Sequence, residues 1–133
     1  MKNLILIGFL FLSINISAQF KIIGKTYKAV ISASCKEFND GGTMIYTYCI
    51  LKFEKKNVTV SYETEFESTR KGIDENSKKT DKGKAYKWVK IRNVITIKGF
   101  NDYGRLKILD EKLIGRKKMN YNEFKALQFD QQL

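Results

Sequence analysis

The sequence predicts an all-β protein, in which an antiparallel up-and-down meander forms a small barrel and a short helix ends the chain. Three observations lead to this fold class. Stretches with the period of two typical of half-buried strands recur between Lys25 and Arg116. Turn signals rich in Gly, Asn and Asp separate them. No proline interrupts any of these stretches.

The clearest element is a hairpin within residues 43–67. Apolar and polar residues alternate from Val58 to Glu67, and Glu54-Lys55-Lys56-Asn57 is a turn signal. If this turn pairs Phe53 with Val58, cross-strand neighbours share a face and one side of the hairpin is apolar. We expect the buried side to comprise Ile45, Cys49, Leu51, Phe53, Val58, Val60, Tyr62 and Phe66.

The strand before this hairpin, Lys25–Cys35, is expected to pair with it and to carry one half of a disulfide. Its alternation places Tyr27, Ala29, Ile31, Ala33 and Cys35 on one face. The turn signal Asn39-Asp40-Gly41-Gly42 suggests a pivot near Gly42, which would place Cys35 opposite Cys49. Opposed strand residues lie within disulfide reach, so we predict a bond between these two cysteines.

Four shorter strands complete the predicted meander, and the end of the chain is open to two interpretations. The strands are Tyr86–Arg92, Val94–Lys98, Arg105–Leu109 and Leu113–Arg116, and the residues expected on their shared buried face are Ile95, Ile97, Leu106, Ile108 and Leu113. In the tail, Asn120 can cap a helix in which Tyr121, Phe124 and Leu127 share a face. We predict this short helix; a final edge strand is the alternative.

The chain is expected to contain a leader, one domain and one long loop. Residues 1–18 have the Lys2 charge, the apolar run Leu4–Leu12 and the small residues of a secretory signal peptide, with cleavage after Ala18. The apolar run is too short to span a membrane, and an N-terminal helix is the alternative. Residues 19–133 then form a single secreted or periplasmic domain. Within it, residues 68–85 are predicted to be a flexible charged loop, or else an ordered functional one.

Composition limits the chemistry that is open to this domain. There is no His, and there are only two Cys, so a Cys/His metal site and a His general base are excluded and no cofactor is expected. We therefore expect a protein that is not an enzyme. The formal net charge of +11 becomes +10 when the leader and its Lys2 are removed. This excess suggests weak binding to polyanions or to anionic membrane surfaces, although a solvated Lys-rich surface is the simpler interpretation.

The order of the motifs resembles that of small bacterial lipocalin-like (calycin-type) secreted β-barrels. The resemblance covers most of residues 22–118 and is based on the opening IIGKTY, on YKW from Tyr86, on ITI from Ile95, on GRLKI from Gly104 and on KLIG from Lys112. It implies a barrel that binds a small apolar molecule. Small residues on the predicted buried face leave room for a ligand among Tyr27, Tyr62, Phe66 and Trp88.

A second face of the opening hairpin suggests an alternative function. Met44, Tyr46, Tyr48 and Ile50 point away from the predicted core, and solvated strands seldom carry such a row. Either the C-terminal segment covers it, or the protein is an interaction module of the inhibitor or immunity type that binds a partner there.

Two further patterns have simple structural interpretations. Glu63, Glu65 and Glu67 are either a carboxylate site or the polar face of a strand. The row of Tyr86, Trp88, Lys90 and Arg92 could stack on nucleic-acid bases, but a core strand with charged ends is the simpler interpretation.

Overall fold

The computed structural model describes residues 21–70, 77–119 and 123–133, and every regular element in these ranges is a β-strand. The strands are β1 (Thr26–Phe38), β2 (Gly41–Phe53), β3 (Asn57–Ser68), β4 (Ser77–Thr80), β5 (Lys84–Ile91), β6 (Val94–Ile97), β7 (Arg105–Leu109), β8 (Lys112–Lys118) and β9 (Phe124–Gln132).

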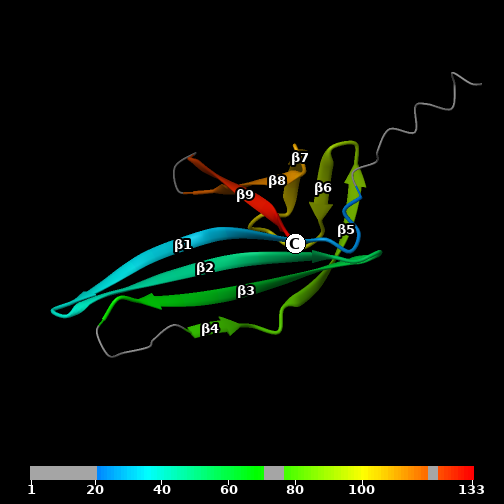
Figure 1. The fold of residues 1–133 in the computed structure, drawn as a ribbon. Helices are drawn as coiled ribbons and strands as arrows, with labels where there is room; N and C mark the ends of the chain where they lie inside the picture. The colour runs from blue at the N-terminus through cyan, green and yellow to red at the C-terminus, as the bar shows by residue number, and fades with distance from the viewer. Residues whose placement is uncertain (1–20, 71–76, 120–122) are drawn as a thin grey trace, which may run out of the picture.

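Eight of these strands close into an antiparallel barrel. The hydrogen-bonded order is β2-β1-β9-β8-β7-β6-β5-β3, and the pairing of β2 with β3 completes the ring. The fourth strand, β4, lies outside the ring, beside β3 (Figure 1). Around the core, closure removes the exposed edges that an open sheet of this size would have. The predicted all-β barrel is confirmed, and it is compatible with the lipocalin-like resemblance.

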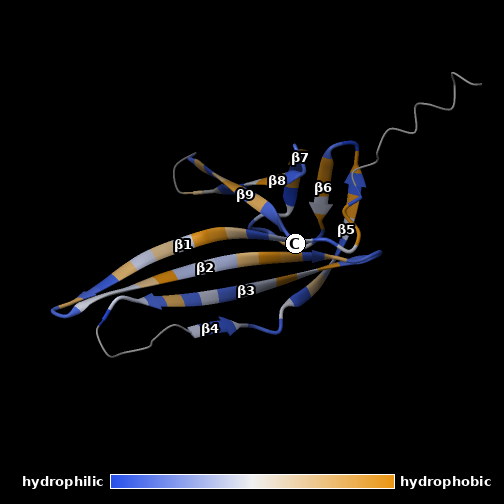
Figure 2. Ribbon diagram, in the orientation of Figure 1, coloured by the Kyte–Doolittle hydropathy of each residue, from blue (hydrophilic) through white to orange (hydrophobic). Residues whose placement is uncertain are grey.

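The core fills the end of the barrel at which β2 turns into β3. We call this the closed end of the barrel. The turns between β5 and β6 and between β7 and β8 lie at the same end. Tyr27, Leu51 and Phe53 have no exposed surface, and the ring of Phe53 meets that of Tyr27 edge-to-face at 5.9 Å. Figure 2 shows polar and apolar residues alternating along β3. Such alternation places one apolar row inside the barrel and one polar row outside.

The register predicted for the β2–β3 hairpin is confirmed residue by residue. Phe53 pairs with Val58, Cys49 with Tyr62 and Ile45 with Phe66. The shared face predicted for the later strands is also present: Ile95, Ile97, Leu106 and Leu113 are buried, and Ile108 packs against them.

The register predicted for β1 and β2 is wrong, because the chain turns earlier and contains a bulge. The turn is formed by Asn39 and Asp40, since Phe38 already pairs with Gly41. The register shifts at Ile31, which lies between the pairs Val30–Tyr48 and Ser32–Thr47. An extra residue in one strand reverses the alternation beyond it. Beyond the bulge, Ala33 and Cys35 therefore lie on the outer face instead of the predicted inner one.

The predicted C-terminal helix is also wrong, because Phe124–Gln132 forms strand β9. Leu127 and Phe129 are buried, and the residues on either side of each are exposed, which is the alternation of a strand. One edge of β9 pairs with β8 and the other with β1, so this segment closes the barrel. Ladder hydrogen bonds on both edges outweigh the weak local preference for a helix.

Two other expected segments are only partly described. The predicted leader, residues 1–18, lies outside the described residues. Within the predicted loop 68–85, residues 77–80 form β4, Lys84 and Ala85 belong to β5, and residues 71–76 lie outside the described part. The flexibility of this segment stays a prediction.

A long arm extends away from the closed end. It consists of residues 30–48 and 62–68 with β4, and Figure 1 shows β1, β2 and β3 running together well past β5 to β9. The contacts that hold it are mainly those between neighbouring strands, since Thr43–Phe53 pairs continuously with Val58–Ser68. The arm therefore presents two broad sheet faces beyond the packed core.

Candidate functional site

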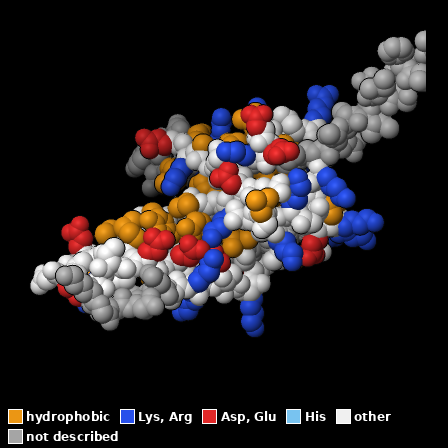
Figure 3. Space-filling view, viewed as in Figure 1, with side chains coloured by type: hydrophobic (Ala, Val, Ile, Leu, Met, Phe, Trp, Pro, Cys, Tyr) orange, Lys and Arg blue, Asp and Glu red, His pale blue; other side chains and the backbone are white. Residues whose placement is uncertain are grey.

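The outer face of the arm is the candidate site. We call it the arm face and extend it by one residue pair towards the closed end; its apolar members are Val30, Ala33, Cys35, Met44, Tyr46, Tyr48 and Ile50. The ladder pairs Val30 with Tyr48 and Ala33 with Tyr46, so side chains from β1 and β2 meet on this face. Figure 3 shows hydrophobic side chains gathered over the arm, next to a row of carboxylates. The strand β9 pairs with β1 at Thr26–Lys28, and three of its side chains line a hollow together with Val30 and Tyr48.

A network of two lysines and two glutamates borders the apolar row. Lys28 Nζ lies 2.6 Å from Glu63 Oε1 and 3.0 Å from Glu65 Oε1. Lys78 Nζ, from β4, lies 3.2 Å and 2.9 Å from the same two oxygens. Thr80 donates its hydroxyl to Glu63 Oε2 at 3.1 Å. Because these partners surround it, Glu63 is only 7% exposed although it is on the outer face of the barrel wall.

The network keeps its carboxylates ionised and its lysines protonated. Hydrogen bonds from Lys78 and Lys28 lower the pKa of Glu65 from 4.5 to about 2. Burial opposes the charged form of Lys28, but its hydrogen bonds to Glu63 and Glu65 outweigh burial and raise its pKa. The ammonium of Lys28 also lies 3.8 Å from the ring centroid of Tyr48, a cation–π distance. The network therefore holds Tyr48 in place beside Tyr46, whose ring centroid is 6.3 Å away.

A fork between β1 and β9 lies beside the arm face. The two strands pair at Thr26–Lys28 and then diverge, so the edge of β1 from 29 to 38 faces no strand in the described part of the chain. A hollow of about 420 Å³ lies at the fork, with Val30, Tyr48 and Gln128 among its lining residues. Lys125 of β9 reaches across the gap and donates to the carbonyl of Ile31 at 3.5 Å.

The predicted disulfide between Cys35 and Cys49 is not present. Both cysteines are free; Cys35 is exposed and Cys49 is buried. Cys35 pairs with Met44 on the outer face, and Cys49 pairs with Ala29 on the inner face, so the two thiols lie on opposite sides of the sheet. The early turn and the bulge in β1 together cause this difference.

The four residues predicted to line a ligand differ in their surroundings. Tyr27 is fully buried in the core. Trp88 packs on Phe53 at the closed end and donates its Nε1 hydrogen to the carbonyl of Glu54 at 2.9 Å. Tyr62 is partly buried against the core. Phe66 lies on the arm, and the ligand role of all four stays a prediction.

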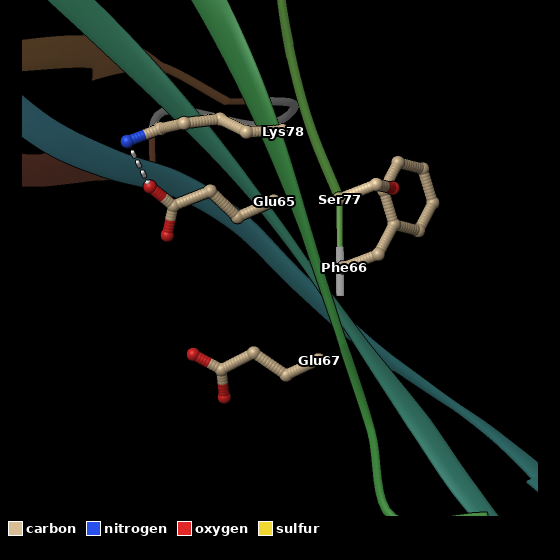
Figure 4. A pocket seen from close by; sticks show the side chains of 5 residues that line it. All are labelled: Glu65, Phe66, Glu67, Ser77 and Lys78. Atoms are coloured by element: carbon tan, nitrogen blue, oxygen red, sulfur yellow. Dashed lines mark ion pairs between the residues drawn. The ribbon is translucent and has the colours of Figure 1, made fainter. Parts of the chain in front are cut away.

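The inner and outer sides of the arm differ in character at β3 and β4. In Figure 4, Glu65, Glu67 and Lys78 extend to one side of the strands, while Phe66 and Ser77 extend to the other. These five residues line a hollow of about 240 Å³. The glutamates thus belong to the polar face of the strand, and Glu63 and Glu65 are held there by lysines.

Tyr86 and Trp88, the aromatic residues of the alternative nucleic-acid site, pack against the core. The ring of Tyr86 lies 5.6 Å from that of Phe100. This arrangement favours the core-strand interpretation, because stacking on bases requires exposed ring faces.

Sequence reasoning missed the lysines of the network. No local pattern in the strand that contains Lys28 indicates a partner for this side chain, and Lys78 lies in the segment predicted to be a loop. The only local signal was that Glu63 and Glu65, separated by Thr64, fall on one face of a strand. Two carboxylates so close together are stabilised by cations on the neighbouring strands.

No protein-family model matches the sequence, and no curated protein and no solved structure is found to be similar to it. Among the described residues, no helix is long and apolar enough to cross a membrane. The same residues contain no group of three or more His, Cys, Asp or Glu side chains arranged to hold a metal ion.

Proposed function

We propose that this protein is a secreted, non-enzymatic binding protein that attaches to a protein partner through the arm face and the neighbouring edge of β1. The single observation that carries the proposal is the fork. Strand β1 has 13 residues, of which Thr26–Lys28 pair with β9, and the rest of that edge borders the arm face. Secretion after removal of residues 1–18 is inferred from the sequence.

Strand addition supplies a physical mechanism for such binding. An extended segment of the partner can form main-chain hydrogen bonds with the free edge of β1, since backbone donors and acceptors at an edge need partners. Val30, which is 47% exposed, and Tyr48 would contact its side chains from the arm face. The hollow at the fork can take one larger apolar side chain. Tyr and Met are residues that interfaces favour.

Charge suggests what this partner segment contains. Lys28 and Lys78 already pair with Glu63 and Glu65, so the network is neutral. Glu67, which pairs with Met44 across the ladder, is exposed and forms no ion pair within the described part of the chain. A partner with alternating apolar residues and a Lys or Arg near Glu67 would complement this surface.

The proposal is tested by site-directed crosslinking in the producing cells. A photoreactive residue in place of Ala33, which is exposed on the arm face, should capture a partner; the same residue in place of Lys107, on the opposite wall of the barrel, should not. The captured protein is then purified and mixed with the unlabelled chain. Binding should slow amide exchange along 29–38 and should weaken by about tenfold or more in Tyr48→Ser.

Two results would refute it: exchange along β1 that does not change in the complex, or equal affinity for Tyr48→Ser and for the control Thr59→Ser. Thr59 is partly exposed on β3 near the closed end, outside the arm, so its replacement leaves the arm face unchanged.

A small apolar ligand remains the second candidate, and one observation favours it. On the inner side of the arm, Ile45, Tyr62 and Phe66 are only partly buried, in contrast to the fully buried residues at the closed end. A lipocalin-like protein would bind its ligand in such an open mouth. Native mass spectrometry of the protein purified from its producing cells distinguishes the candidates: a bound small molecule that is released by Phe66→Asp supports this one.

A further inference from the structure

The outer wall near the turns of β5, β6 and β7 combines apolar and cationic side chains. Ile91 pairs with Val94, Val94 pairs with Lys107, and Thr96 pairs with Arg105. The residues that alternate with these on β6 and β7, such as Ile95 and Leu106, are buried, so this row points outward. We call it the basic hairpin patch, and its members are Ile91, Arg92, Val94, Arg105, Lys107 and Leu109.

Two large aliphatic side chains at this patch are unusually exposed. Ile91 is 71% exposed and Leu109 is 53% exposed, and each lies next to a turn. The two turns are neighbours, because Ile108 N donates to the carbonyl of Asn93 at 2.7 Å. The turn residues themselves are polar, but the aliphatic residue at the end of each preceding strand is left largely exposed, which favours contact with something apolar.

Cations lie beside Ile91, whereas the turn after Leu109 carries the acids Asp110 and Glu111. Arg92 and Arg105 line the same hollow of about 610 Å³ as Ile91 and Val94. In the described part of the chain, neither guanidinium forms an ion pair or a hydrogen bond. Arg92 has φ 54°, a left-handed conformation that is uncommon for a residue with a long side chain.

We propose that the basic hairpin patch docks the closed end of the barrel on the surface of an anionic phospholipid membrane. Ile91 and Leu109 would enter the boundary between headgroups and acyl chains, and Arg92, Arg105 and Lys107 would bind the phosphates above it. Guanidinium groups suit this role because they donate two hydrogen bonds to one phosphate.

The choice of a lipid surface follows from the pairing of charge with apolar exposure. A soluble polyanion such as heparin would satisfy Arg92 and Arg105 but would leave Ile91 and Leu109 in water. A membrane removes both from water at once. The arm face offers anionic headgroups no comparable attraction, because Lys28 and Lys78 are already paired with Glu63 and Glu65. This inference does not depend on the proposed protein partner.

Vesicle binding tests the proposal. The secreted chain, which begins at Gln19, should sediment with vesicles of phosphatidylglycerol and phosphatidylcholine, and much less with vesicles of phosphatidylcholine alone. Ile91→Ser with Leu109→Ser should weaken binding by about tenfold or more, because each buried aliphatic side chain contributes substantially to partition. Arg92→Gln with Arg105→Gln should weaken it by about fivefold per charge removed.

Matched controls separate this patch from the general positive charge. Phe124, 62% exposed at the other end of the barrel, provides the apolar control Phe124→Ser. Lys79→Gln with Lys82→Gln removes two positive charges outside the patch. Both controls should change vesicle binding by less than about twofold: Phe124 is far from the patch, and screening limits the range of each charge.

The single tryptophan reports the orientation of the bound protein. Trp88 lies on β5, three residues before Ile91 and at the closed end, so lipids with quenching groups on their acyl chains should quench its fluorescence in the bound state. The proposal is overturned if the wild type does not bind anionic vesicles, if the control variants lose as much binding as the patch variants, or if Trp88 in the bound protein is not quenched. Circular dichroism of each variant verifies that it is folded.

Discussion

Replacing the two cysteines one at a time distinguishes the observed register from the predicted disulfide. Cys49 has no exposed surface, lies in the core between Ala29 and Tyr62 on neighbouring strands, and has its pKa raised to about 12, first by burial. Cys35 is exposed on the arm face. The two substitutions should therefore have different effects, because a bonded pair would make them equivalent.

The magnitudes follow from burial. Cys49→Ser introduces a hydroxyl into an apolar core and should lower the free energy of unfolding by about 1–3 kcal/mol. For a domain of this size, such a loss lowers Tm by about 5–10 °C. Cys35→Ser should change the free energy of unfolding by less than about 0.5 kcal/mol, since substitutions at exposed positions have small effects.

The assay combines thermal unfolding with titration of thiols. In the folded protein, a thiol reagent should modify Cys35 quickly and Cys49 only at the rate of unfolding, and a reductant should leave Tm unchanged. The reasoning is refuted if the native protein has no titratable thiol, or if both substitutions destabilise equally. Equal losses of about 3 kcal/mol would be the value expected for a disulfide that closes this loop.

Three other predictions concern the charge network, strand β9 and one turn. The pKa of Glu65 is lower in the folded chain than its ordinary 4.5, so its contribution to stability is present above pH 4.5 and is lost as the pH falls towards 2. Urea unfolding of the wild type and of Glu65→Gln at pH 6 and pH 3 measures this contribution. The free energy of unfolding should change less between the two pH values in the variant than in the wild type. Phe129→Ala should lower the free energy of unfolding by about 3–5 kcal/mol, because this side chain is fully buried. Phe124 is exposed, so Phe124→Ala should lower it by less than about 0.5 kcal/mol. Similar losses for both variants in denaturant titrations would contradict the placement of β9. In Gly104→Ala the added Cβ would overlap the backbone oxygen of Phe100, so calorimetry should show that the free energy of unfolding falls by about 1–3 kcal/mol. In Gly42→Ala the added Cβ makes ordinary contacts, so the free energy of unfolding should fall much less.

The two surfaces of the barrel have different chemistry, which has a consequence for the orientation of the molecule. The arm face carries glutamates and tyrosines, and the basic hairpin patch carries arginines and exposed aliphatic residues. If both proposals hold, the closed end would rest on a membrane and the arm would project towards a protein partner. Each surface can be tested alone, because Tyr48→Ser leaves the basic hairpin patch unchanged and Ile91→Ser with Leu109→Ser leaves the arm face unchanged.

The β2–β3 hairpin was predictable in full from the sequence. Its turn is short, its strands alternate strictly, and only one register places all the apolar residues of both strands on the same side. The partner surface Met44, Tyr46, Tyr48 and Ile50 could be located for the same reason, although its role stays a prediction. The four lysine–glutamate contacts could not, because Lys28 and Lys78 come from strands that are distant along the chain.

The alternation of apolar and polar residues along the chain determined that this protein is an antiparallel β-barrel. The reason is that the positions of the apolar residues within each strand indicate which face of that strand is buried. The tertiary structure alone decided the bulge at Ile31, the position of Cys35 and the strand β9. The reason is physical: a bulge or a closing strand gains its stability from ladder hydrogen bonds with distant segments, and those energies exceed the small local preferences for a straight strand or a helical turn.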